Sequence, residues 1–199
     1  LCDVISGKTQ PTTGRVFFDS QEITHTKETD IALMGIGRKF QTPTVFDSLT
    51  TYENMELALP GNQKVWQNLW SQTTPEQREK IHAILERVRL IEQLETEAKY
   101  LSHGQRQWLA ISVLVLSSPK LLLVDEPAAG LADSETELTA QLLTELKEDH
   151  TLVVIEHDMD FVRQLNSTVT VLNEGKVMAE GPLAEVQKNQ EVIEAYLGR

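Results

Sequence analysis

Residues 121–127 read LLLVDEP, a run of apolar residues that ends in two acids and a proline. Continuous apolar runs of this length are typical of parallel strands that are covered on both faces. In open α/β sheets, ligands bind at the edge where the carboxyl ends of the strands meet. The run therefore predicts a buried parallel strand that delivers Asp125 and Glu126 to such an edge. Taken alone, the two acids could instead lie in a solvated turn after the strand and cap a following helix.

Helical and strand patterns alternate on both sides of this run. Downstream, the sequence predicts a helix over 134–148, a strand over 151–155, a hairpin over 169–179 and a helical tail from Pro182. Upstream, it predicts a strand over 16–18, another strand ending at Gln41, and a helix over 105–117. Such alternation is typical of an α/β fold, in which helices cross over between the strands of a mostly parallel sheet.

The middle of the chain is polar and helical. Residues 75–90 begin with a proline and carry apolar residues at helical spacing, which predicts an amphipathic helix. Trp66 and Trp70, four residues apart, would pack on one helical face or form a docking surface for a partner. We divide the chain into a first core segment over 1–50, a helical subdomain over 51–103 and a second core segment over 104–199.

Composition narrows the functional classes. The chain has 199 residues, 40% of them hydrophobic, and a formal net charge of -12. Because nucleic-acid binding relies on clustered Lys and Arg, this acidic balance argues against a nucleic-acid partner. Cys2 is the one cysteine, which excludes an internal disulfide and fits a reducing compartment. No apolar run approaches the roughly 18 residues that a membrane span needs.

Residues 101–105 read LSHGQ and offer a second candidate site. Ser102, followed three residues later by Gln105, matches a capping box that opens a helix. The free N–H groups and the dipole of a helix N-terminus also bind phosphate, and Gly104 would let the backbone approach closely. Capping and phosphate binding use the same geometry, so this motif alone is compatible with both.

The remaining candidates follow strands. Asp125 would orient Mg²⁺, and Glu126 would act as general base toward an attacking water. His157, after the strand at 151–155, could contact a γ-phosphate or that water, or be a surface histidine beside a helix cap at Asp158. Gln41 could ligate Mg²⁺ or hold water, although a single glutamine is weak evidence.

In their order and spacing, Gln41, LSHGQ at 101–105, LLLVDEP at 121–127 and His157 resemble the motifs of the ATP-binding cassette (ABC) family. They match its Q-loop, signature motif, Walker B motif and switch histidine. The resemblance implies a P-loop NTPase-like fold, with the helical subdomain inserted between the Q-loop and the signature motif. It also implies that ATP and Mg²⁺ are the ligands.

The resemblance further implies that the protein works as a head-to-tail pair with a second ABC ATPase, either a copy of itself or a relative. Ser102, Gly104 and Gln105 would face the γ-phosphate of ATP held by that partner. Asp125 and Gln41 would bind Mg²⁺. Glu126 and His157 would take part in the hydrolysis of ATP. Residues 48–59 would face transmembrane permease subunits at the cytoplasmic side of the membrane, and a solute-binding protein would take part indirectly.

Three stretches narrow the likeness to uptake systems for urea and branched-chain amino acids: residues 35–41 (GIGRKFQ), 126–131 (EPAAGL) and 195–199 (AYLGR). Within this group, His103 in the signature and the following Gln107 and Trp108 resemble the urea branch, which we favour. The segment at 129–132 (AGLA) departs from the usual D-loop, and Asp133 comes one place late.

A P-loop is the expected motif that we do not find. Residues 6–9 (SGKT) resemble its end, but the glycine that should precede Gly7 by five residues is replaced by Cys2. Leu1 to Ile5 is typical of the tail of a helix, and we expect the P-loop of the family to precede Leu1. The 199 residues alone are then expected neither to bind ATP tightly nor to hydrolyse it.

Two other functions fit less well. A soluble ABC ATPase of translation or DNA repair would usually bring a second cassette, coiled-coil arms or basic patches. A naturally truncated, non-enzymatic partner subunit could still donate Ser102 and Gly104 to an intact partner. An in-frame P-loop in the coding sequence before Leu1 would favour the enzyme over this second alternative.

Overall fold

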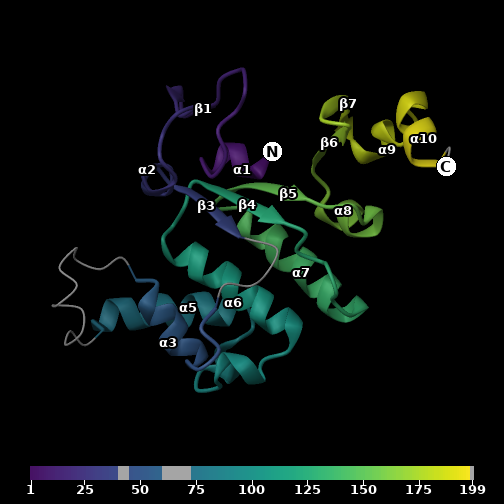
Figure 1. Ribbon diagram of the computed structural model, residues 1–199. Coiled ribbons are helices and arrows are strands. Elements are labelled where there is room, and N and C mark those ends of the chain that lie inside the picture. The colour runs from purple at the N-terminus through teal and green to yellow at the C-terminus, as the bar shows by residue number, and fades with distance from the viewer. Residues whose placement is uncertain (40–44, 60–72, 198–199) are drawn as a thin grey trace.

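The computed structural model describes residues 1–39, 45–59 and 73–197 (Figure 1). Its centre is a parallel sheet of β3 (Ile36–Lys39), β4 (Leu121–Asp125) and β5 (Thr151–Ile155), with β4 in the middle. Leu122, Leu123 and Val124 are each at most 1% exposed. The prediction of a buried parallel strand ending at Asp125 is therefore confirmed. Gln41, Trp66 and Trp70 lie outside the described residues.

Helices cover both faces of this sheet. The long helices α6 (His103–Leu116) and α7 (Asp133–Leu146) pack on one face, where the larger apolar core forms. On the other face lie α1 (Cys2–Ile5), α2 (Glu28–Leu33) and a smaller core with Cys2, Ile31 and Leu123 (Figure 1). The predicted α/β fold, a parallel sheet with flanking helices, is confirmed.

Before β3, the chain differs from expectation in detail. The strand expected over 16–18 is the two-residue β1 (Phe17–Phe18), which pairs antiparallel with β2 (Gln21–Glu22) and not with the central sheet. The apolar residues at 31–33 belong to α2, and the strand that precedes Gln41 begins only at Ile36. Apolar runs this short do not distinguish helix from strand.

The helical subdomain contains α3 (Thr51–Leu57), α5 (Pro75–Arg87), η1 (Ile91–Gln93) and η2 (Ala98–Tyr100). Capping boxes on Thr50 and Thr74 fix the starts of its two α-helices. The predicted helix from Pro75 forms but ends before 90, because Arg89 takes a left-handed conformation with φ of 60°. Buried Ile81, Ile84, Leu85 and Val88 join it to the larger core.

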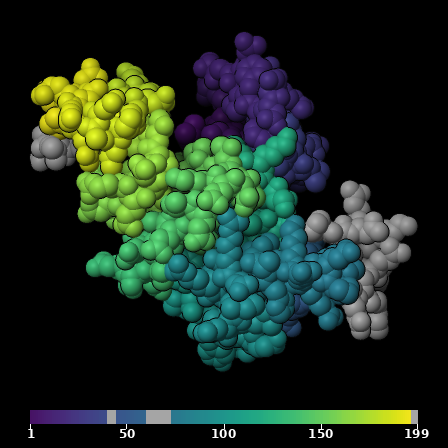
Figure 2. Space-filling model, turned by 180° about the vertical axis from the view of Figure 1, so that it is seen from behind, coloured from purple at the N-terminus to yellow at the C-terminus, as the bar shows by residue number. Residues whose placement is uncertain are grey.

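After β5, α8 (Met159–Leu165) leads into the hairpin of β6 (Thr168–Asn173) and β7 (Lys176–Pro182). Glu174 and Gly175 both have positive φ, as a tight two-residue hairpin turn requires. The short helices α9 (Leu183–Val186) and α10 (Gln190–Leu197) follow, which confirms the predicted hairpin and helical tail. Figure 2 shows these C-terminal elements and the helical subdomain at opposite ends of the molecule.

A wide groove separates the hairpin from the central sheet. It has a volume of about 750 Å³ and is lined largely by apolar side chains of β5, α8, β6 and the final helices. Leu1 also lines it. Across the three described ranges, we find no helix that is both long and apolar enough to cross a membrane.

Candidate functional site

Two of the predicted catalytic residues meet at the carboxyl ends of neighbouring strands. Glu126 follows β4, and its backbone N–H donates a hydrogen bond to the carbonyl of Ile155 at the end of β5, at 2.9 Å. The side chain of Glu126 is 31% exposed, and its Oε1 lies 3.7 Å from Nδ1 of His157, which is 77% exposed. That separation exceeds a direct hydrogen bond. The two groups are therefore close to each other and open to solvent.

Glu126 adopts an unusual backbone conformation. Its φ is 44°, in the left-handed region that non-glycine residues rarely enter. Such residues persist only where the surrounding structure holds them, and they gather at functional sites. The hydrogen bond from its N–H to the carbonyl of Ile155 is one such restraint.

Glu156, which the sequence analysis did not single out, contacts the backbone near both Glu126 and His157. The side chain of Glu156 is 2% exposed, and its carboxylate accepts hydrogen bonds from the backbone N–H groups of Ala128 and His157, at 2.9 and 3.1 Å. The alternation of β5 contains a signal for this, because residue 156 continues the face of Leu152 and Val154, which packs against the larger core. An acid at that position predicts a buried, satisfied carboxylate.

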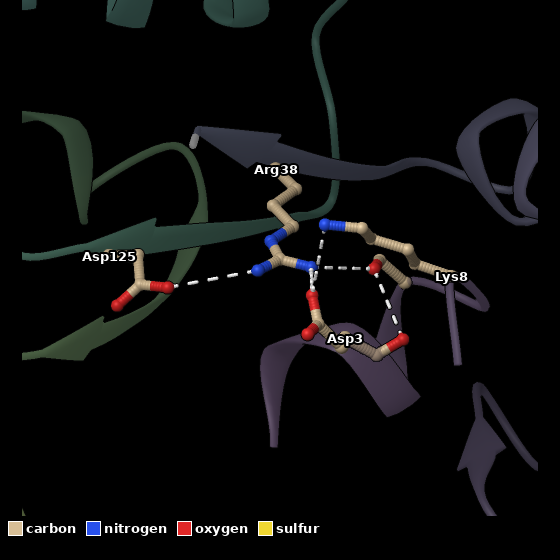
Figure 3. Close-up of polar contacts among 5 residues, drawn as sticks. Asp3, Lys8, Arg38 and Asp125 are labelled. Carbon is tan, nitrogen blue, oxygen red and sulfur yellow. Dashed lines mark hydrogen bonds and ion pairs between the residues drawn. The ribbon is translucent and has the colours of Figure 1, made fainter. Parts of the chain in front are cut away.

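Asp125 is held by a basic residue of the neighbouring strand (Figure 3). Arg38 of β3 reaches its Oδ2 at 3.7 Å, and the same guanidinium pairs with Asp3 and donates to Oγ of Ser6 at 3.1 Å. The hydrogen bond that Arg38 donates to Asp3 is the main reason why the pKa of Asp3 is lowered. No local sequence pattern indicated that Arg38 would join α1 to the end of β4.

The residues present fit Mg²⁺ only as part of a nucleotide site. Within the described ranges, no three His, Cys, Asp or Glu side chains form a group that could hold a metal ion. Mg²⁺ in phosphate sites is usually bound by one or two carboxylates together with water and phosphate oxygens. Asp125, 28% exposed at the strand end, is a suitable single carboxylate.

Lys39 lies one residue beyond Arg38 and points to the opposite face of the sheet. It is 2% exposed, and its Nζ has no hydrogen-bond partner among the described residues. Burial lowers the pKa of Lys39 to about 8, against the attraction of the Asp125 and Glu156 carboxylates.

The signature motif forms the predicted cap. Oγ of Ser102 accepts a hydrogen bond from the backbone N–H of Gln105 at 3.2 Å, and the Gln105 side chain accepts one from the N–H of Ser102 at 2.9 Å. This reciprocal arrangement opens α6 and confirms the capping box. At the same helix end, the ring of His103 lies 3.3 Å from the carbonyl of Ala129, in the turn after β4.

A second unpredicted acid lies against this cap. Ser102 donates its hydroxyl proton to Oε1 of Glu135 in the first turn of α7, at 2.8 Å. A Cβ placed on Gly104 would come within 2.7 Å of the same carboxylate. The space that Gly104 leaves open is therefore filled by Glu135 in the single subunit. The other Glu135 oxygen lies 3.4 Å from the N–H of Ala132, in the altered D-loop segment.

Residues 6–9 lack the strand–loop–helix geometry of a P-loop. They follow the short helix α1, and the next helix along the chain, α2, begins only at Glu28. Gly7 has a φ of 76°, and Lys8 points back to Asp3 at 3.8 Å. This geometry supports the interpretation of the segment as an accidental likeness, and the position of the P-loop stays a prediction.

The structure thus forms two groups of predicted residues. Asp125, Glu126 and His157 gather at the strand ends, while Ser102, Gly104 and Gln105 open α6. Comparison with known proteins explains why both groups occur in one chain. A family model described as "ABC transporter" matches residues 1–129, and a second, described as "Branched-chain amino acid ATP-binding cassette transporter", matches residues 176–199. The chain belongs to the ABC transporter family.

Curated relatives agree with this assignment. The chain is 33% identical over 205 residues to the high-affinity branched-chain amino acid transport ATP-binding protein LivG of Escherichia coli, covering 98% of this chain and 80% of LivG. The identity and coverage are the same for BraF of Pseudomonas aeruginosa. A probable LivG of Archaeoglobus fulgidus is 31% identical, over 98% of this chain and 78% of the relative.

Solved structures agree as well. A nucleotide-free ATP-binding cassette from an ABC transporter superposes with a TM-score of 0.83 at 30% identity, covering 99% of this chain and 82% of that one. The ADP conformation of such a cassette gives the same TM-score and identity, over 100% and 82% of the two chains. The ABC ATPase fold is therefore shown, and the cassettes that share it bind nucleotide.

Proposed function

We propose that this protein is the ATP-binding subunit of an ABC importer that couples ATP hydrolysis to the uptake of urea or a related small solute such as a branched-chain amino acid. The observation that carries the proposal is the placement of Glu126 and His157 side by side at the ends of adjacent parallel strands, next to Asp125. This is the edge at which open α/β sheets bind their ligands.

Each residue at this edge has a distinct chemical task. Glu126 would accept a proton from the attacking water, since its carboxylate is accessible and 3.7 Å from His157. His157 would donate a hydrogen bond toward the γ-phosphate, which its exposure allows. Asp125 and Gln41 would hold Mg²⁺, which neutralises phosphate charge when it is bound. Asp125 would have to exchange its contact with Arg38 for the metal.

The signature motif would act on a different ATP, held by a second ABC ATPase subunit. At the N-terminus of the fourteen-residue helix α6, backbone N–H groups and the helix dipole favour an anion. Ser102, Gly104 and Gln105 form this helix start. The proposed pair would place it against the partner's γ-phosphate.

Contact with permease subunits is proposed for residues 48–59. This segment contains α3, where Leu57 is 62% exposed, and Phe46 just before it is 61% exposed. Large apolar side chains that are open to solvent, such as these two, are available for contact with a partner. The protein would then lie on the cytoplasmic face of the membrane through its permease, with a solute-binding protein acting indirectly.

Two solutes are proposed for the importer, urea and a branched-chain amino acid. The relatives carry names of branched-chain amino acid transport, which supports that solute. The residues His103, Gln107 and Trp108 support urea. Because the permease and binding protein select the solute in such systems, uptake must be measured on the whole importer.

The test uses protein expressed from the complete coding sequence and reconstituted with its permease and binding protein in liposomes. ATP-dependent uptake of labelled leucine or urea, lost with Glu126→Gln, would support the proposal and identify the solute. ATP turnover unchanged by Glu126→Gln would contradict it. If no ATP is hydrolysed but an intact partner ATPase is activated through Ser102, the non-enzymatic alternative replaces it.

The inactivity of residues 1–199 on their own stays a prediction. It is tested by measuring phosphate release from this polypeptide beside its Glu126→Gln variant. Turnover above that control would refute it.

A further inference from the structure

Glu156 joins the turn after β4 to the turn after β5. One carboxylate oxygen accepts the N–H of Ala128 at 2.9 Å, and the other accepts the N–H of His157 at 3.1 Å. Ala128 comes two residues after Glu126, and His157 comes directly after Glu156 itself. A single side chain therefore bonds to the backbone on both sides of the proposed catalytic pair.

The environment of Glu156 is costly for an acid. With its side chain 2% exposed, an ionised carboxylate is destabilised unless hydrogen bonds and opposite charge offset the lost hydration. The two backbone donors supply the hydrogen bonds. Lys39 lies on the same face of the sheet, because it pairs with Val124, which pairs with Val154, two residues before Glu156. It is attracted by the Asp125 carboxylate and, less strongly, by that of Glu156. A neutral residue would fill this space at less cost.

The contacts of Glu156 complete the restraint of Glu126. The N–H of Glu126 is already bonded to Ile155 at 2.9 Å, and the bond from Ala128 to Glu156 ties the turn to β5 a second time. Glu126 has a φ of 44°, so this turn would relax if it were released. His157 is fixed by the other oxygen. One carboxylate therefore bonds to the backbone beside both Glu126 and His157, whose side chains lie 3.7 Å apart.

We propose that Glu156 is a positioning residue for ATP hydrolysis. It holds Glu126 and His157 in position relative to each other by accepting hydrogen bonds from the turns after β4 and β5, and Lys39 balances its charge. The proposal rests on the proposed function, since it names the residue that positions the same catalytic pair, Glu126 and His157. Glu156 itself would touch neither nucleotide nor water.

The experiment compares Glu156→Gln and Glu156→Ala in the complete protein assembled with its permease. An amide oxygen can accept one of the two N–H bonds, while alanine accepts neither. Because displacements of about 1 Å in an active site can cost up to about 100-fold in rate, we expect kcat to fall about 5-fold for Gln and about 30-fold or more for Ala. KM for ATP should change by less than about twofold, because nucleotide contacts remain.

Glu137→Gln is the matched control, since it removes the same charge from an exposed position on α7. Rates are compared at a temperature well below the lowest Tm of the set, so that loss of folded protein does not enter. Equal kcat for wild type, Glu137→Gln and Glu156→Gln would overturn the proposal. A lowered Tm with unchanged kcat would overturn it too, because Glu156 would then serve stability alone. If Glu156→Ala does not fold, Glu156→Gln decides.

Lys39→Met gives a second arm. If Lys39 balances Glu156, the loss of kcat in the double variant Lys39→Met/Glu156→Gln should be smaller than the product of the two single losses. Independent, multiplicative losses would remove Lys39 from the proposal. Failure of the proposed function is separate: it shows as turnover that Glu126→Gln does not reduce.

Discussion

Replacing Thr139 by valine should destabilise the junction between the signature helix and the helix after the D-loop. Nε1 of Trp108 in α6 donates to Oγ1 of Thr139 in α7 at 2.9 Å, and Thr139 is fully buried. Valine keeps the shape of the side chain but cannot accept, so the indole N–H, in a side chain 7% exposed, is left unpaired. Thr139 also donates to the carbonyl of Glu135 at 2.7 Å, and that bond is lost too.

The expected magnitude follows from this geometry. An unsatisfied buried donor costs about 1–3 kcal/mol. Threonine and valine differ little in helix propensity, so almost all of the cost should come from the lost hydrogen bonds. For a chain of this size, each kcal/mol lowers Tm by about 2–4 °C, which gives a fall of about 2–12 °C. Thermal unfolding followed by far-UV circular dichroism measures it.

Thr144→Val is the matched control on the same helix. Thr144 donates only to the carbonyl of Ala140, one turn back, and no indole depends on it. Its Tm should therefore change by less than about 2 °C. A Trp108→Phe background should remove most of the cost of Thr139→Val, since the donor is then absent. Equal Tm values for Thr139→Val and Thr144→Val would refute the assignment of the cost to the Trp108 hydrogen bond.

Three further predictions concern single residues. Glu126→Gln should lower kcat for ATP hydrolysis by about 100-fold or more while ATP binding persists; comparable turnover in a phosphate-release assay would count against it. Glu135→Gln should strengthen ATP-dependent pairing of subunits, because a carboxylate now bonded to Ser102 repels an incoming phosphate; weaker pairing in sedimentation velocity, with Glu137→Gln as control, would argue that Glu135 supports the site. Burial raises the pKa of the Cys2 thiol, so this thiol should react slowly with Ellman's reagent until the protein unfolds. The contribution of Cys2 to stability should decline as pH rises from the ordinary thiol pKa through the raised one. Fast labelling of the native protein would contradict this.

The elements that the sequence predicted well are those whose signals are local. The apolar run before Asp125 requires cover on both faces, and the Ser102 to Gln105 spacing closes a box within one turn, so both are determined by neighbours in sequence. The hairpin turn at 173–176 is local in the same way. The short strand before Gln41 was placed only approximately, because its apolar residues begin in α2.

The contacts that surround the site were not predictable from local patterns. Arg38 meets Asp3 across 35 positions, and Ser102 meets Glu135 across 33. Such pairs depend on which strands become neighbours and on where each helix begins. The role of Glu156 was predictable in part. The alternation of β5 indicates that its side chain is buried, but only the fold shows that Ala128 is its partner.

The signature cap shows why capping and phosphate binding need not compete. Ser102 accepts the N–H of Gln105 through its oxygen lone pairs and donates its proton to Glu135. A phosphate oxygen could receive that same proton without disturbing the cap, provided that the Glu135 carboxylate withdraws. The acid then occupies, in the single subunit, the position that an anion would take in the pair. On this reasoning Ser102→Ala should cost stability by about 1 kcal/mol through the lost cap, and should also lower ATP-dependent pairing. Glu135→Gln should have the opposite effect on pairing. Together the two variants distinguish the capping role of the Ser102 oxygen from the role of its hydroxyl as a hydrogen-bond donor.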